Sequence, residues 1–508
     1  MPIDPDAQQS FRSLRRDLMA YVRPAEWRNP DPAEPYDLLV IGAGPAGLAA
    51  AELAIEQGAK VALIERHLLG GVSLLTGSVP SKSIIRTSRL YADMRDAEAF
   101  GAIVPGGIQE NFAAAAERMQ RLRMRIGGYH SADRLKLAGI DLYFGAARFS
   151  GRNAVILDKT AIRFKKALIA SGARPMDMVI PGLEQRDYFT SEQIFDLTTC
   201  PRRLLVIGGG PLGCELAQAF CRLGSHVVIV QNEPKFLPKE ERDAAQILSE
   251  SLARDGVEIH LNTRVIAVRT AATGERLVDI VSDDNQGTIT TDHILTSVGR
   301  TPNVEDLNLE KAEIAYDTEQ GIRVDDFLRT TNRRIYAAGD VCLAHRFTHA
   351  AEASARLAVA NALFRGRKRW SALTIPWCTY TDPEIAHVGL YVSEARERSI
   401  PTKTITMLMH DTDRAMIDGE ESGFVKIHVK DGTDEILGAT IVASHAGEMI
   451  NEITLAIDAG IGLSVLARII HAYPTQANAI KMAADVFAKS QRKPPPSHGI
   501  ARPPWPAD

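Results

Sequence analysis

The chain has 508 residues, of which 59 are Lys or Arg and 63 are Asp or Glu, so its formal net charge is −4. This length predicts about three or four domains with ample core, and 45% hydrophobic with 24% charged residues is an ordinary globular composition. The near-neutral charge argues against a nucleic-acid-binding surface. No run approaches the roughly 18 apolar residues of a membrane span, and residues 1–29 are polar, so we expect no membrane insertion and a cytoplasmic location.

The two ends of the chain carry different patterns. Residues 11–22 have apolar side chains at helical spacing with three arginines between them. This pattern predicts a helix that lies either on a membrane surface or, the alternative we favour, on the protein's own surface. Residues 491–508 are rich in proline, which extends as polyproline II and does not pack into a core. We expect a disordered tail there.

A gapless repeat dominates the chain. Residues 38–65 (LLVIGAGPAGLAAAELAIEQGAKVALIE) align with residues 204–231 (LLVIGGGPLGCELAQAFCRLGSHVVIVQ). Each copy is an apolar run, a G-x-G-x-x-G turn, a helical segment and a second apolar run, which predicts a strand, helix, strand unit twice over. The chain is therefore expected to contain two nucleotide-binding folds of the Rossmann type.

The glycines of each turn have separate physical reasons. Gly42 and Gly208 allow a tight turn, Gly44 and Gly210 let the backbone approach a pyrophosphate, and Gly47 and Gly213 let helix and strand pack closely. The phosphates then lie at a helix N-terminus. These six glycines predict two dinucleotide sites.

The residue that ends each repeat distinguishes the two sites. Glu65 is placed to accept hydrogen bonds from ribose hydroxyls in the first site. Gln231 stands at the same position of the second site and lacks the carboxylate that would repel a 2′-phosphate, while Lys235 and Lys239 follow in the same loop. We therefore expect NADPH in preference to NADH at the second site, unless these lysines only form a solvated face.

The five cysteines, Cys200, Cys214, Cys221, Cys342 and Cys378, have neither C-x-x-C nor C-x4-C spacing. This spacing predicts no zinc site and no close redox dithiol. We expect no metal in this protein.

Further motifs accompany the two Rossmann units: residues 330–340 (TTNRRIYAAGD), 170–175 (ASGARP), 296–303 (TSVGRTPN), 22–32 (VRPAEWRNPDP), 347–365 (FTHAAEASARLAVANALFR) and 373–390 (LTIPWCTYTDPEIAHVGL). With these motifs the chain resembles the flavoprotein pyridine nucleotide-disulfide oxidoreductase superfamily, class I, and within it the mercuric-reductase-like FAD-dependent oxidoreductases. The resemblance covers roughly residues 20–490. It implies an α/β fold in which an FAD domain is split by an NAD(P) domain, followed by a C-terminal α+β domain that makes a homodimer.

The glycine turns and this resemblance together divide the chain and assign its binding residues. The expected parts are an N-terminal arm (1–35), an FAD-binding domain in two pieces (36–185 and 301–373), an NAD(P)-binding domain (186–300), a dimerisation domain (374–490) and the tail (491–508). FAD-binding residues are Gly42, Gly44, Pro45, Ala46, Gly47, Glu65, Arg66, Gly71, Lys82, Gly172 and Asp340. NAD(P)-binding residues are Gly208, Gly210, Pro211, Leu212, Gly213, Glu215, Gln231, Lys235 and Gly299.

The catalytic residues implied by the resemblance are partly kept. Lys82, in Pro80-Ser81-Lys82, corresponds to a lysine near flavin N5 that pairs with a glutamate, here Glu215. Such a lysine stabilises negative charge on the reduced flavin. The family segment usually reads G-G-x-C-x-x-x-x-C-x-P-S-K, whereas this chain has Ser73 and Ser78 at the two cysteine positions. A hydroxyl forms no disulfide and stores no electrons.

The acid/base pair of the family is changed as well. Its C-terminal H-P-T-x-x-E stretch reads Tyr473-Pro474-Thr475-Gln476-Ala477-Asn478 here. Members of the mercuric-reductase-like branch also have tyrosine at this position, so we assign Tyr473 a catalytic role. Asn478 cannot carry the charge that orients a base. His471 lies two residues before Tyr473 and is either a structural neighbour or a substitute base.

These residues favour an FAD-dependent NAD(P)H oxidoreductase without a redox disulfide. Hydride would pass from nicotinamide to flavin and then directly to a small acceptor, such as a quinone, another electron acceptor, oxygen or a second nicotinamide. The loss of two thiols and one carboxylate supports an alternative, a catalytically retired flavoprotein that acts as a binding or scaffold protein. The resemblance itself supports a third, a disulfide or mercuric reductase.

Overall fold

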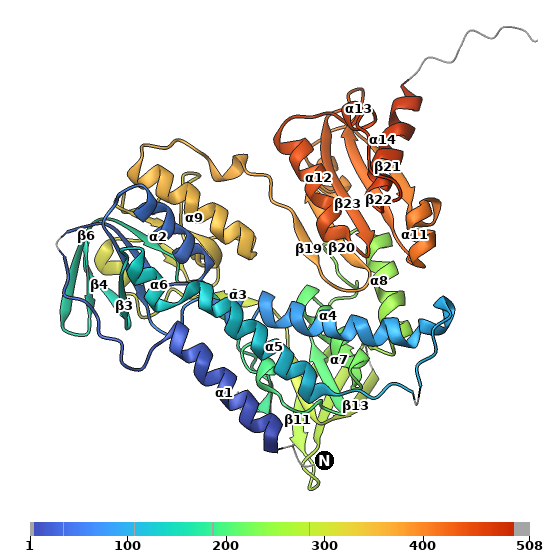
Figure 1. Cartoon of the computed structure of the whole chain (residues 1–508), viewed down its shortest axis with the longest axis horizontal. Coiled ribbons are helices and arrows are strands. Elements are labelled where there is room, and N and C mark those ends of the chain that lie inside the picture. Colours follow the sequence, from blue (N-terminus) through green and yellow to red (C-terminus); the bar gives the residue numbers. More distant parts are fainter. Residues whose placement is uncertain (1–4, 34, 106, 185–186, 284, 492–508) are drawn as a thin grey trace, which may run out of the picture. The chain divides into compact units, whose positions relative to one another are not determined.

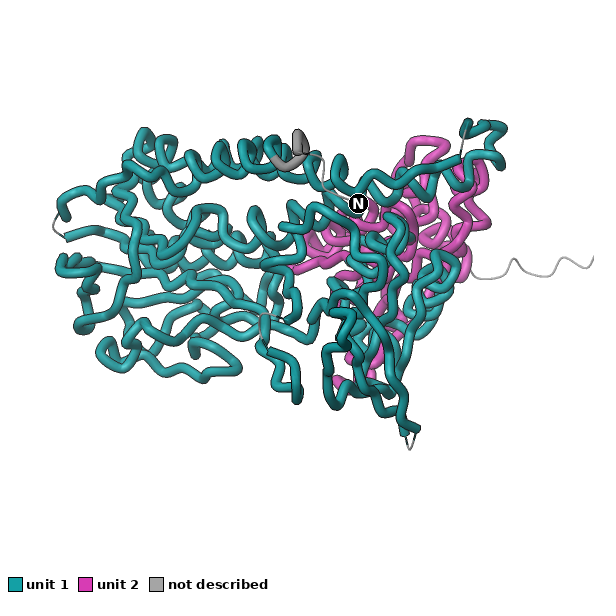
Figure 2. Tube along the Cα trace, turned by 90° about the horizontal axis from the view of Figure 1, so that it is seen from below, with its two compact units in different colours: residues 1–373, 379–382 teal, residues 374–378, 383–508 magenta. Residues whose placement is uncertain are grey.

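The computed structural model describes residues 5–33, 35–105, 107–184, 187–283 and 285–491. The chain forms two compact units (Figure 2). The first is drawn from Met1–Leu373 and Thr379–Asp382, and the second from Thr374–Cys378 and Pro383–Asp508. The expected Pro-rich tail, residues 491–508, lies outside the described residues except for Gln491.

The first nucleotide fold is built on a seven-stranded sheet. Its strands are β1 (Tyr36–Ile41), β2 (Val61–Glu65), β3 (Asp141–Phe144), β4 (Ala147–Gly151), β5 (Ala154–Leu157), β6 (Thr160–Ile169) and β18 (Ile335–Ala337). Their order is β3-β2-β1-β6-β5-β4, with β18 also paired to β6. Strands β1, β2, β3, β6 and β18 pair in parallel, whereas β4 and β5 add an antiparallel edge.

Both faces of the parallel strands are buried, which explains their unbroken apolar sequence. Leu38 and Val40 of β1 point into a core that includes the alanines of α2 (Pro45–Glu56) and α9 (Thr348–Leu363). Leu39 and Ile41 point to the opposite face, where the core contains Phe149 and Phe164. Helices α2 and α9 lie side by side (Figure 1), because their small residues permit close packing.

Five further helices belong to this part of the first unit: α1 (Pro5–Val22), α3 (Gly71–Leu75), α4 (Ser78–Arg95), α5 (Phe112–Gly127) and α6 (Ala132–Leu137). Helix α1 packs on α5 (Figure 1), with Leu18 and Val22 buried. A Cβ on Gly127 of α5 would lie 2.6 Å from Leu18 Cδ1. Of the two alternatives for residues 11–22, the structure therefore has the helix on the protein's own surface. Within the part of the chain that the structure describes, no helix has the length and apolar character needed to cross a bilayer.

The second nucleotide fold has its own parallel sheet. Its elements are β8 (Arg203–Ile207), α7 (Pro211–Arg222), β9 (His226–Val230), α8 (Arg242–Asp255), β10 (Glu258–His260) and β14 (His293–Thr296). The strand order is β10-β9-β8-β14, and every pair is parallel. A three-stranded antiparallel sheet follows α8 and β10, with β11 (Thr263–Thr270), β12 (Arg276–Ser282) and β13 (Asn285–Thr291). The predicted strand, helix, strand unit is thus present twice.

Two short ladders complete the first unit. Strand β7 (Ala173–Pro175) pairs antiparallel with β15 (Arg300–Pro302), and β16 (Tyr316–Asp317) pairs with β17 (Gly321–Ile322). The β7–β15 ladder joins the segment that leaves the first fold to the segment that returns from the second. The motifs at residues 170–175 and 296–303 therefore lie side by side.

The second unit is an α+β structure. Its sheet has the order β19-β20-β23-β22-β21, with β19 (Trp377–Thr379), β20 (Glu384–Gly389), β21 (Thr402–Leu408), β22 (Phe424–Lys430) and β23 (Ile436–Ala443). Its helices are α10 (Val392–Glu397), α11 (Asp413–Asp418), α12 (Ala446–Asp458), α13 (Leu463–Leu466) and α14 (Asn478–Ser490). Helices α12 and α14 pack on the sheet around an apolar core. The expected fold class is confirmed.

Candidate functional site

The first glycine turn joins β1 to α2 and exposes bare backbone. Gly42 has a φ of 100°, which favours glycine, and a Cβ there would overlap the carbonyl oxygen of Ala170. A Cβ on Gly47 would overlap the carbonyl oxygen of Gly42, so glycine lets α2 pack on β1. A Cβ on Gly71 would lie 2.7 Å from the Cα of Gly44. These two facing glycines leave a cradle without side chains at the N-terminus of α2, which fits a pyrophosphate.

Glu65 ends β2 and its carboxylate holds the glycine turn. Oε2 accepts a hydrogen bond from the backbone N–H of Ala43 at 2.7 Å, and Oε1 accepts one from that of His67 at 2.6 Å. Each oxygen keeps a further lone pair, so the carboxylate still fits ribose hydroxyls. The neighbouring Arg66 has an exposed side chain, and its carbonyl oxygen accepts a hydrogen bond from Arg23.

The second glycine turn repeats the backbone of the first. Gly208 has a φ of 105°, and a Cβ there would lie 2.5 Å from the carbonyl oxygen of Ser297. A Cβ on Gly213 would overlap the carbonyl oxygen of Gly208, whereas a Cβ on Gly210 would meet no atom within 4 Å. This open position at the N-terminus of α7 fits the pyrophosphate of a second dinucleotide.

Each turn is followed by a helix that begins with proline. Pro45 opens α2 and Pro211 opens α7, where the fixed φ suits a helix and the missing N–H has no intrahelical acceptor. Ala46 is buried behind Pro45, and Leu212 is half-buried behind Pro211. These four residues shape the helix starts and offer no polar side chain to a ligand.

Gln231 follows β9, and its amide is buried against the second turn. Nε2 donates to the carbonyl oxygen of Lys235 at 2.7 Å. Oε1 is buried without a hydrogen-bond partner, and a Cβ on Gly209 would overlap it. A ribose hydroxyl can donate to such an orphaned oxygen. Lys235 and Lys239, in the following loop, are both exposed.

The turns at residues 170–175 and 296–303 lie against Gly42 and Gly208 and are hydrogen-bonded to each other. Gly172 and Gly299 have positive φ values of 70° and 124°. Ser171 Oγ donates to the carbonyl oxygen of Asn303 at 2.8 Å, and Asn303 Nδ2 donates back to that of Ser171 at 2.9 Å. Arg174 bridges to Glu305 through two hydrogen bonds of 3.0 Å. The turns at residues 170–175 and 296–303 therefore form one structure.

Asp340 lies in a short 3-10 turn, Gly339–Val341, after β18. Burial raises the pKa of its carboxyl group, and Arg300 and Arg346 partly offset this effect. Arg300 Nε lies 3.6 Å from Asp340 Oδ2. The Nε atoms of Arg300 and Arg346 are both buried without a hydrogen-bond partner. A partly buried carboxylate beside two guanidinium groups with unpaired Nε atoms fits the polar part of a bound flavin nucleotide.

Lys82 and Glu215 meet between α4 and α7. Lys82 Nζ lies 2.8 Å from Glu215 Oε2, and the glutamate side chain is only 4% exposed. Glu215 Oε1 accepts a hydrogen bond of 2.8 Å from the backbone N–H of Tyr380. The ring of Tyr380 lies under the lysine ammonium, 4.6 Å from Nζ to the ring centroid. Sequence reasoning paired the first two residues and missed Tyr380, which stands in one of the quoted family motifs.

Ser73 and Ser78 flank the N-terminus of α9. Thr348 Oγ1 donates to Ser73 Oγ at 3.1 Å and lies 3.4 Å from Ser78 Oγ. The hydroxyl groups of Ser73, Ser78 and Thr348 thus lie together. The two serines occupy the positions where the resemblance implies thiols. The role of Thr348 was not expected from the sequence.

Tyr473 and Asn478 belong to the second unit. Tyr473 is 72% exposed, and its hydroxyl donates to Asp413 Oδ2 at 2.7 Å, a hydrogen bond that raises the tyrosine pKa. Asn478 opens α14 and its side chain is half-buried. His471 Nε2 lies 2.8 Å from Glu452 Oε1, and its Nδ1 lies 3.4 Å from the carbonyl oxygen of Ile469. Both ring nitrogens of His471 therefore face acceptors of its own chain, which favours its structural alternative.

All five cysteines lie within the described residues, where they form no disulfide with one another. Burial raises the pKa of Cys200 and Cys221 to about 11 and raises that of Cys214 and Cys342 further. Thiols of this kind are poor nucleophiles. The described residues hold no cluster of three or more His, Cys, Asp or Glu side chains suited to a metal ion.

The first unit therefore brings two glycine turns, the carboxylates of Glu65 and Asp340 and the Lys82–Glu215 pair into one compact body. Comparison with known proteins identifies the family of the chain. Residues 36–356 match the pyridine nucleotide-disulphide oxidoreductase family, and residues 375–484 match its dimerisation domain. The chain belongs to the pyridine nucleotide-disulphide oxidoreductase family.

Individual relatives span nearly the whole chain. A mercuric reductase of Staphylococcus aureus is 33% identical over 459 residues, which cover 90% of this chain and 83% of the relative. A dihydrolipoyl dehydrogenase of Thermus scotoductus is 32% identical over 462 residues, covering 89% and 98% of the two chains.

Two solved structures are similar in fold. One is the HOCl-induced flavoprotein disulfide reductase RclA of Escherichia coli, with a TM-score of 0.79, 26% identity and coverage of 89% and 100% of the two chains. The other is LpdA of Mycobacterium tuberculosis, with a TM-score of 0.80, 29% identity and coverage of 89% and 99%. Family membership makes this chain a flavoprotein oxidoreductase that uses FAD and a pyridine nucleotide.

Proposed function

We propose that this protein oxidises NAD(P)H and passes the electrons directly to a small acceptor, without a redox disulfide. The Lys82–Glu215 pair is the observation that carries the proposal. FAD, when bound, supplies the two-electron chemistry between nicotinamide and acceptor. In this account Gly42, Gly44 and Gly71 hold its pyrophosphate, Glu65 its ribose and Asp340 its ribityl chain.

Lys82 has a defined electrostatic task in this proposal. Its ammonium is held at Glu215 and partly shielded from solvent, so it stays available to stabilise negative charge that develops nearby. The acceptor takes up two electrons together with the protons needed to balance them. Quinones, other organic electron acceptors, oxygen and a second nicotinamide all meet this requirement.

The absence of a disulfide relay rests on the residues at two positions. Ser73 and Ser78 hydrogen-bond to Thr348 as hydroxyl groups. The four cysteines of the first unit have raised pKa values and poor nucleophilicity. The relatives named as a mercuric reductase and a dihydrolipoyl dehydrogenase support the alternative of mercuric or disulfide reduction, which would need thiolates.

Anaerobic titration of the purified flavoprotein tests the proposal. The flavin is expected to bleach with about one equivalent of a two-electron donor and without the long-wavelength absorbance that a neighbouring thiolate produces. Consumption of two equivalents would overturn the disulfide-free mechanism. Steady-state assays with quinones, dyes and oxygen then separate an enzyme from a retired flavoprotein, because the latter shows no turnover above that of free FAD. Lipoamide, glutathione disulfide and Hg(II) are expected to give little or none.

We also propose NADPH as the preferred donor. Two observations support this: Gln231 is neutral, and Lys235 and Lys239 expose cationic groups in the same loop. Gln231 itself offers only an acceptor oxygen, because its Nε2 is used by Lys235. A phosphate gains nothing from that oxygen, so we expect only a severalfold preference. Stopped-flow reduction with NADPH and NADH measures it, and equal or reversed rates would refute it.

A homodimer built by the second unit is the last part of the proposal. The family's dimerisation domain covers residues 375–484. Leu455 and Ile470 are 65% and 94% exposed and line one hollow of the second unit. Neighbouring exposed apolar side chains such as these support an association surface in this unit. Light scattering on the intact chain tests it, and a monomer near 55.4 kDa would contradict it.

We propose the domain boundaries stated for the sequence on the same basis. The separate sheets of the two nucleotide folds and the separate second unit support a split FAD-binding domain, an NAD(P)-binding domain over residues 186–300 and a dimerisation domain over residues 374–490.

A further inference from the structure

Helices α4 and α7 each carry two charged residues seven positions apart. These are Lys82 and Arg89 on α4, and Glu215 and Arg222 on α7. Seven residues make about two turns, so the two members of each pair lie on one side of their helix, roughly 10 Å apart. At the first level, Lys82 and Glu215 form the ion pair of the candidate site. At the second level, about two helical turns away, the facing residues are Arg89 and Arg222. Because both are positive, they cannot form an ion pair with each other.

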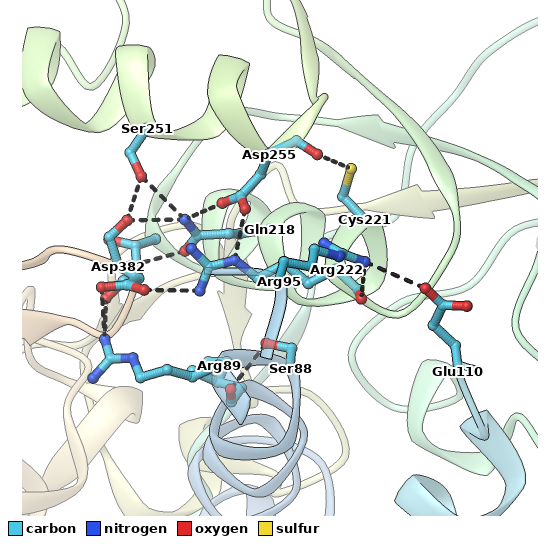
Figure 3. Close-up of polar contacts among 12 residues, drawn as sticks. Ser88, Arg89, Arg95, Glu110, Gln218, Cys221, Arg222, Ser251, Asp255 and Asp382 are labelled. Carbon is cyan, nitrogen blue, oxygen red and sulfur yellow. Dashed lines mark hydrogen bonds and ion pairs between the residues drawn. The ribbon is translucent and has the colours of Figure 1, made fainter. Parts of the chain in front are cut away.

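Asp382 supplies the missing negative charge at the second level (Figure 3). Its Oδ2 lies 2.9 Å from Arg222 Nη1, and its Oδ1 lies 3.4 Å from Arg89 Nη2. The backbone N–H of Asp382 donates to Gln218 Oε1 at 2.8 Å. Its carbonyl oxygen accepts hydrogen bonds from Gln218 Nε2, at 2.9 Å, and from Ser251 Oγ. One residue thus joins α4, α7 and α8.

Asp255, the last residue of α8, orients the groups that hold Asp382. Its Oδ1 accepts from Arg222 Nε and its Oδ2 from Gln218 Nε2, both at 2.8 Å (Figure 3). The Arg222 side chain is only 7% exposed, so its guanidinium needs both carboxylates. The buried guanidinium of Arg222 is therefore paired with the carboxylates of both Asp255 and Asp382.

Segment 380–382 connects the two levels. Tyr380 donates its backbone N–H to Glu215 and places its ring under the Lys82 ammonium. The carbonyl oxygen of Thr381 accepts a hydrogen bond of 3.1 Å from Arg89. Two residues of extended chain span about 7 Å, which is about two-thirds of the separation of the levels. The segment therefore runs along the α4–α7 pair and is held at both ends.

We propose that Asp382 is a positioning residue for the Lys82–Glu215 pair and that it acts through Tyr380. Lys82 has a flexible four-carbon stem, and the aromatic ring limits where its ammonium can lie. The ring of Tyr380 stays in place because Asp382 fixes segment 380–382 at the second level, two helical turns from Lys82. This inference rests on the proposed function, since it assumes that the place of the Lys82 charge matters for flavin reduction.

A double-mutant cycle on the FAD-loaded protein tests the inference. The variants are Asp382→Asn, Lys82→Met and the two combined. The amide keeps the backbone bonds to Gln218 and Ser251 and removes the charge. Misplacement by about 1 Å can cost up to about a hundredfold in rate, and we expect Asp382→Asn to slow flavin reduction at saturating NADPH about tenfold. In the Lys82→Met background the same substitution is expected to change the rate less than about twofold.

Asp187→Asn is the matched control, because Asp187 forms a partly buried ion pair with Arg276 elsewhere in the first unit. It is expected to lower thermal stability without changing the reduction rate. Equal slowing by Asp382→Asn with and without Lys82 would overturn the inference, because a general loss of stability does not depend on the lysine.

Amine-reactive labelling of Lys82, followed by mass spectrometry, adds a readout that needs no turnover. Lys165 serves as an internal reference in every preparation. We expect Asp382→Asn and Tyr380→Leu to increase Lys82 labelling severalfold, and unchanged labelling in both would overturn the inference. Tyr380→Leu keeps the Asp382 cluster and therefore decides the case if Asp382→Asn does not fold. If neither nicotinamide reduces the flavin of the unmodified protein, the proposed function fails, and the labelling result alone decides about positioning.

Discussion

The two glycine turns share a backbone and differ in what surrounds it. Gly42 and Gly208 have φ values of 100° and 105°, and each lies against a backbone carbonyl of a following loop. The first turn is faced by Gly71, whereas nothing lies within 4 Å of a Cβ on Gly210. The same turn geometry, which we propose binds phosphate, is therefore partly enclosed in one copy and open in the other.

The helices that follow the turns differ even more. Helix α2 is mostly alanine, leucine and glycine and packs into the core. Helix α7 buries Glu215, Gln218 and Arg222, which bind α4, α8 and segment 380–382. The two copies of the repeat therefore share the glycine turn, whereas buried polar side chains lie on the second helix only.

The largest expected effect separates the two turns. Gly42→Ala and Gly208→Ala both force a Cβ toward a backbone oxygen at positive φ, a strain of about 1–3 kcal/mol, or roughly 5- to 150-fold in affinity. Gly42→Ala is expected to lose FAD. Gly208→Ala is expected to stay yellow and to lose reduction by NAD(P)H. Absorbance after gel filtration and stopped-flow reduction check each arm, and loss of FAD from both variants would contradict two independent sites.

Exchanging the residues that end the repeats is expected to have a smaller effect. Glu65→Gln removes a charged acceptor of the Ala43 and His67 N–H groups, and a hydrogen bond to a charged group contributes about 1.5–3 kcal/mol. FAD retention should fall about tenfold, as measured by fluorescence of released flavin. Gln231→Glu should shift the donor preference toward NADH about tenfold by repelling a 2′-phosphate. An unchanged donor ratio would remove Gln231 from the specificity site.

Asp340 should show opposite effects on stability and on binding. Because burial raises its pKa, the ionised carboxylate destabilises the fold, and this penalty appears as pH rises from the ordinary aspartate pKa near 3.9 through the raised value. Asp340→Asn should therefore raise the melting temperature of the flavin-free protein by about 1–2 °C at pH 7, with no gain near pH 3. FAD retention should fall.

A second aspartate, Asp37, is expected to have the opposite effect on stability when it ionises. The pKa of Asp37 is lowered, chiefly by its hydrogen bond from Lys165, so its ionised form stabilises the fold above the ordinary aspartate pKa. Asp37→Asn should lower the melting temperature at pH 7 and leave it unchanged near pH 3. If both variants shift the melting temperature in the same direction, the electrostatic explanation is wrong.

The smallest effect is expected at the exposed lysines of the second site. Lys235→Ala should weaken NADPH binding about threefold and leave NADH unchanged, because contacts of an exposed cation are screened by solvent and salt. The KM for each donor at low and at high salt measures this. An equal change for both donors would mean that Lys235 does not face the 2′-phosphate.

The repeat, its glycines and the fold class were predictable because each is a local pattern. Apolar runs on both sides of G-x-G-x-x-G predicted β1, α2 and β2, and also β8, α7 and β9, within a few residues. The Lys82–Glu215 pair was predicted only through the family resemblance. Nothing in the spacing of two residues so far apart indicates contact.

The other parts of the candidate site could not be predicted from local pattern. Tyr380 and Thr348 reach Lys82 and Ser73 through tertiary packing across some 300 residues of chain. The sequence indicates only a turn at Asp382, because Pro383 follows it, yet Asp382 bonds to three helices. The second bonding role of Glu65, toward Ala43 and His67, depends on the exact path of the turn.

The β7–β15 ladder gives the second nucleotide fold adjacent ends. Pro175 pairs with Arg300, Arg174 with Thr301 and Ala173 with Pro302. This is the antiparallel register of a hairpin, but the two strands are connected through the whole second nucleotide fold instead of a short turn. A module with adjacent ends can be inserted into a loop of its host without disturbing the host's core. For protein engineering, the same junction is a natural place to exchange the second nucleotide fold between relatives, provided that the donor segment also keeps the residues of α7 that bond to Lys82 and Asp382.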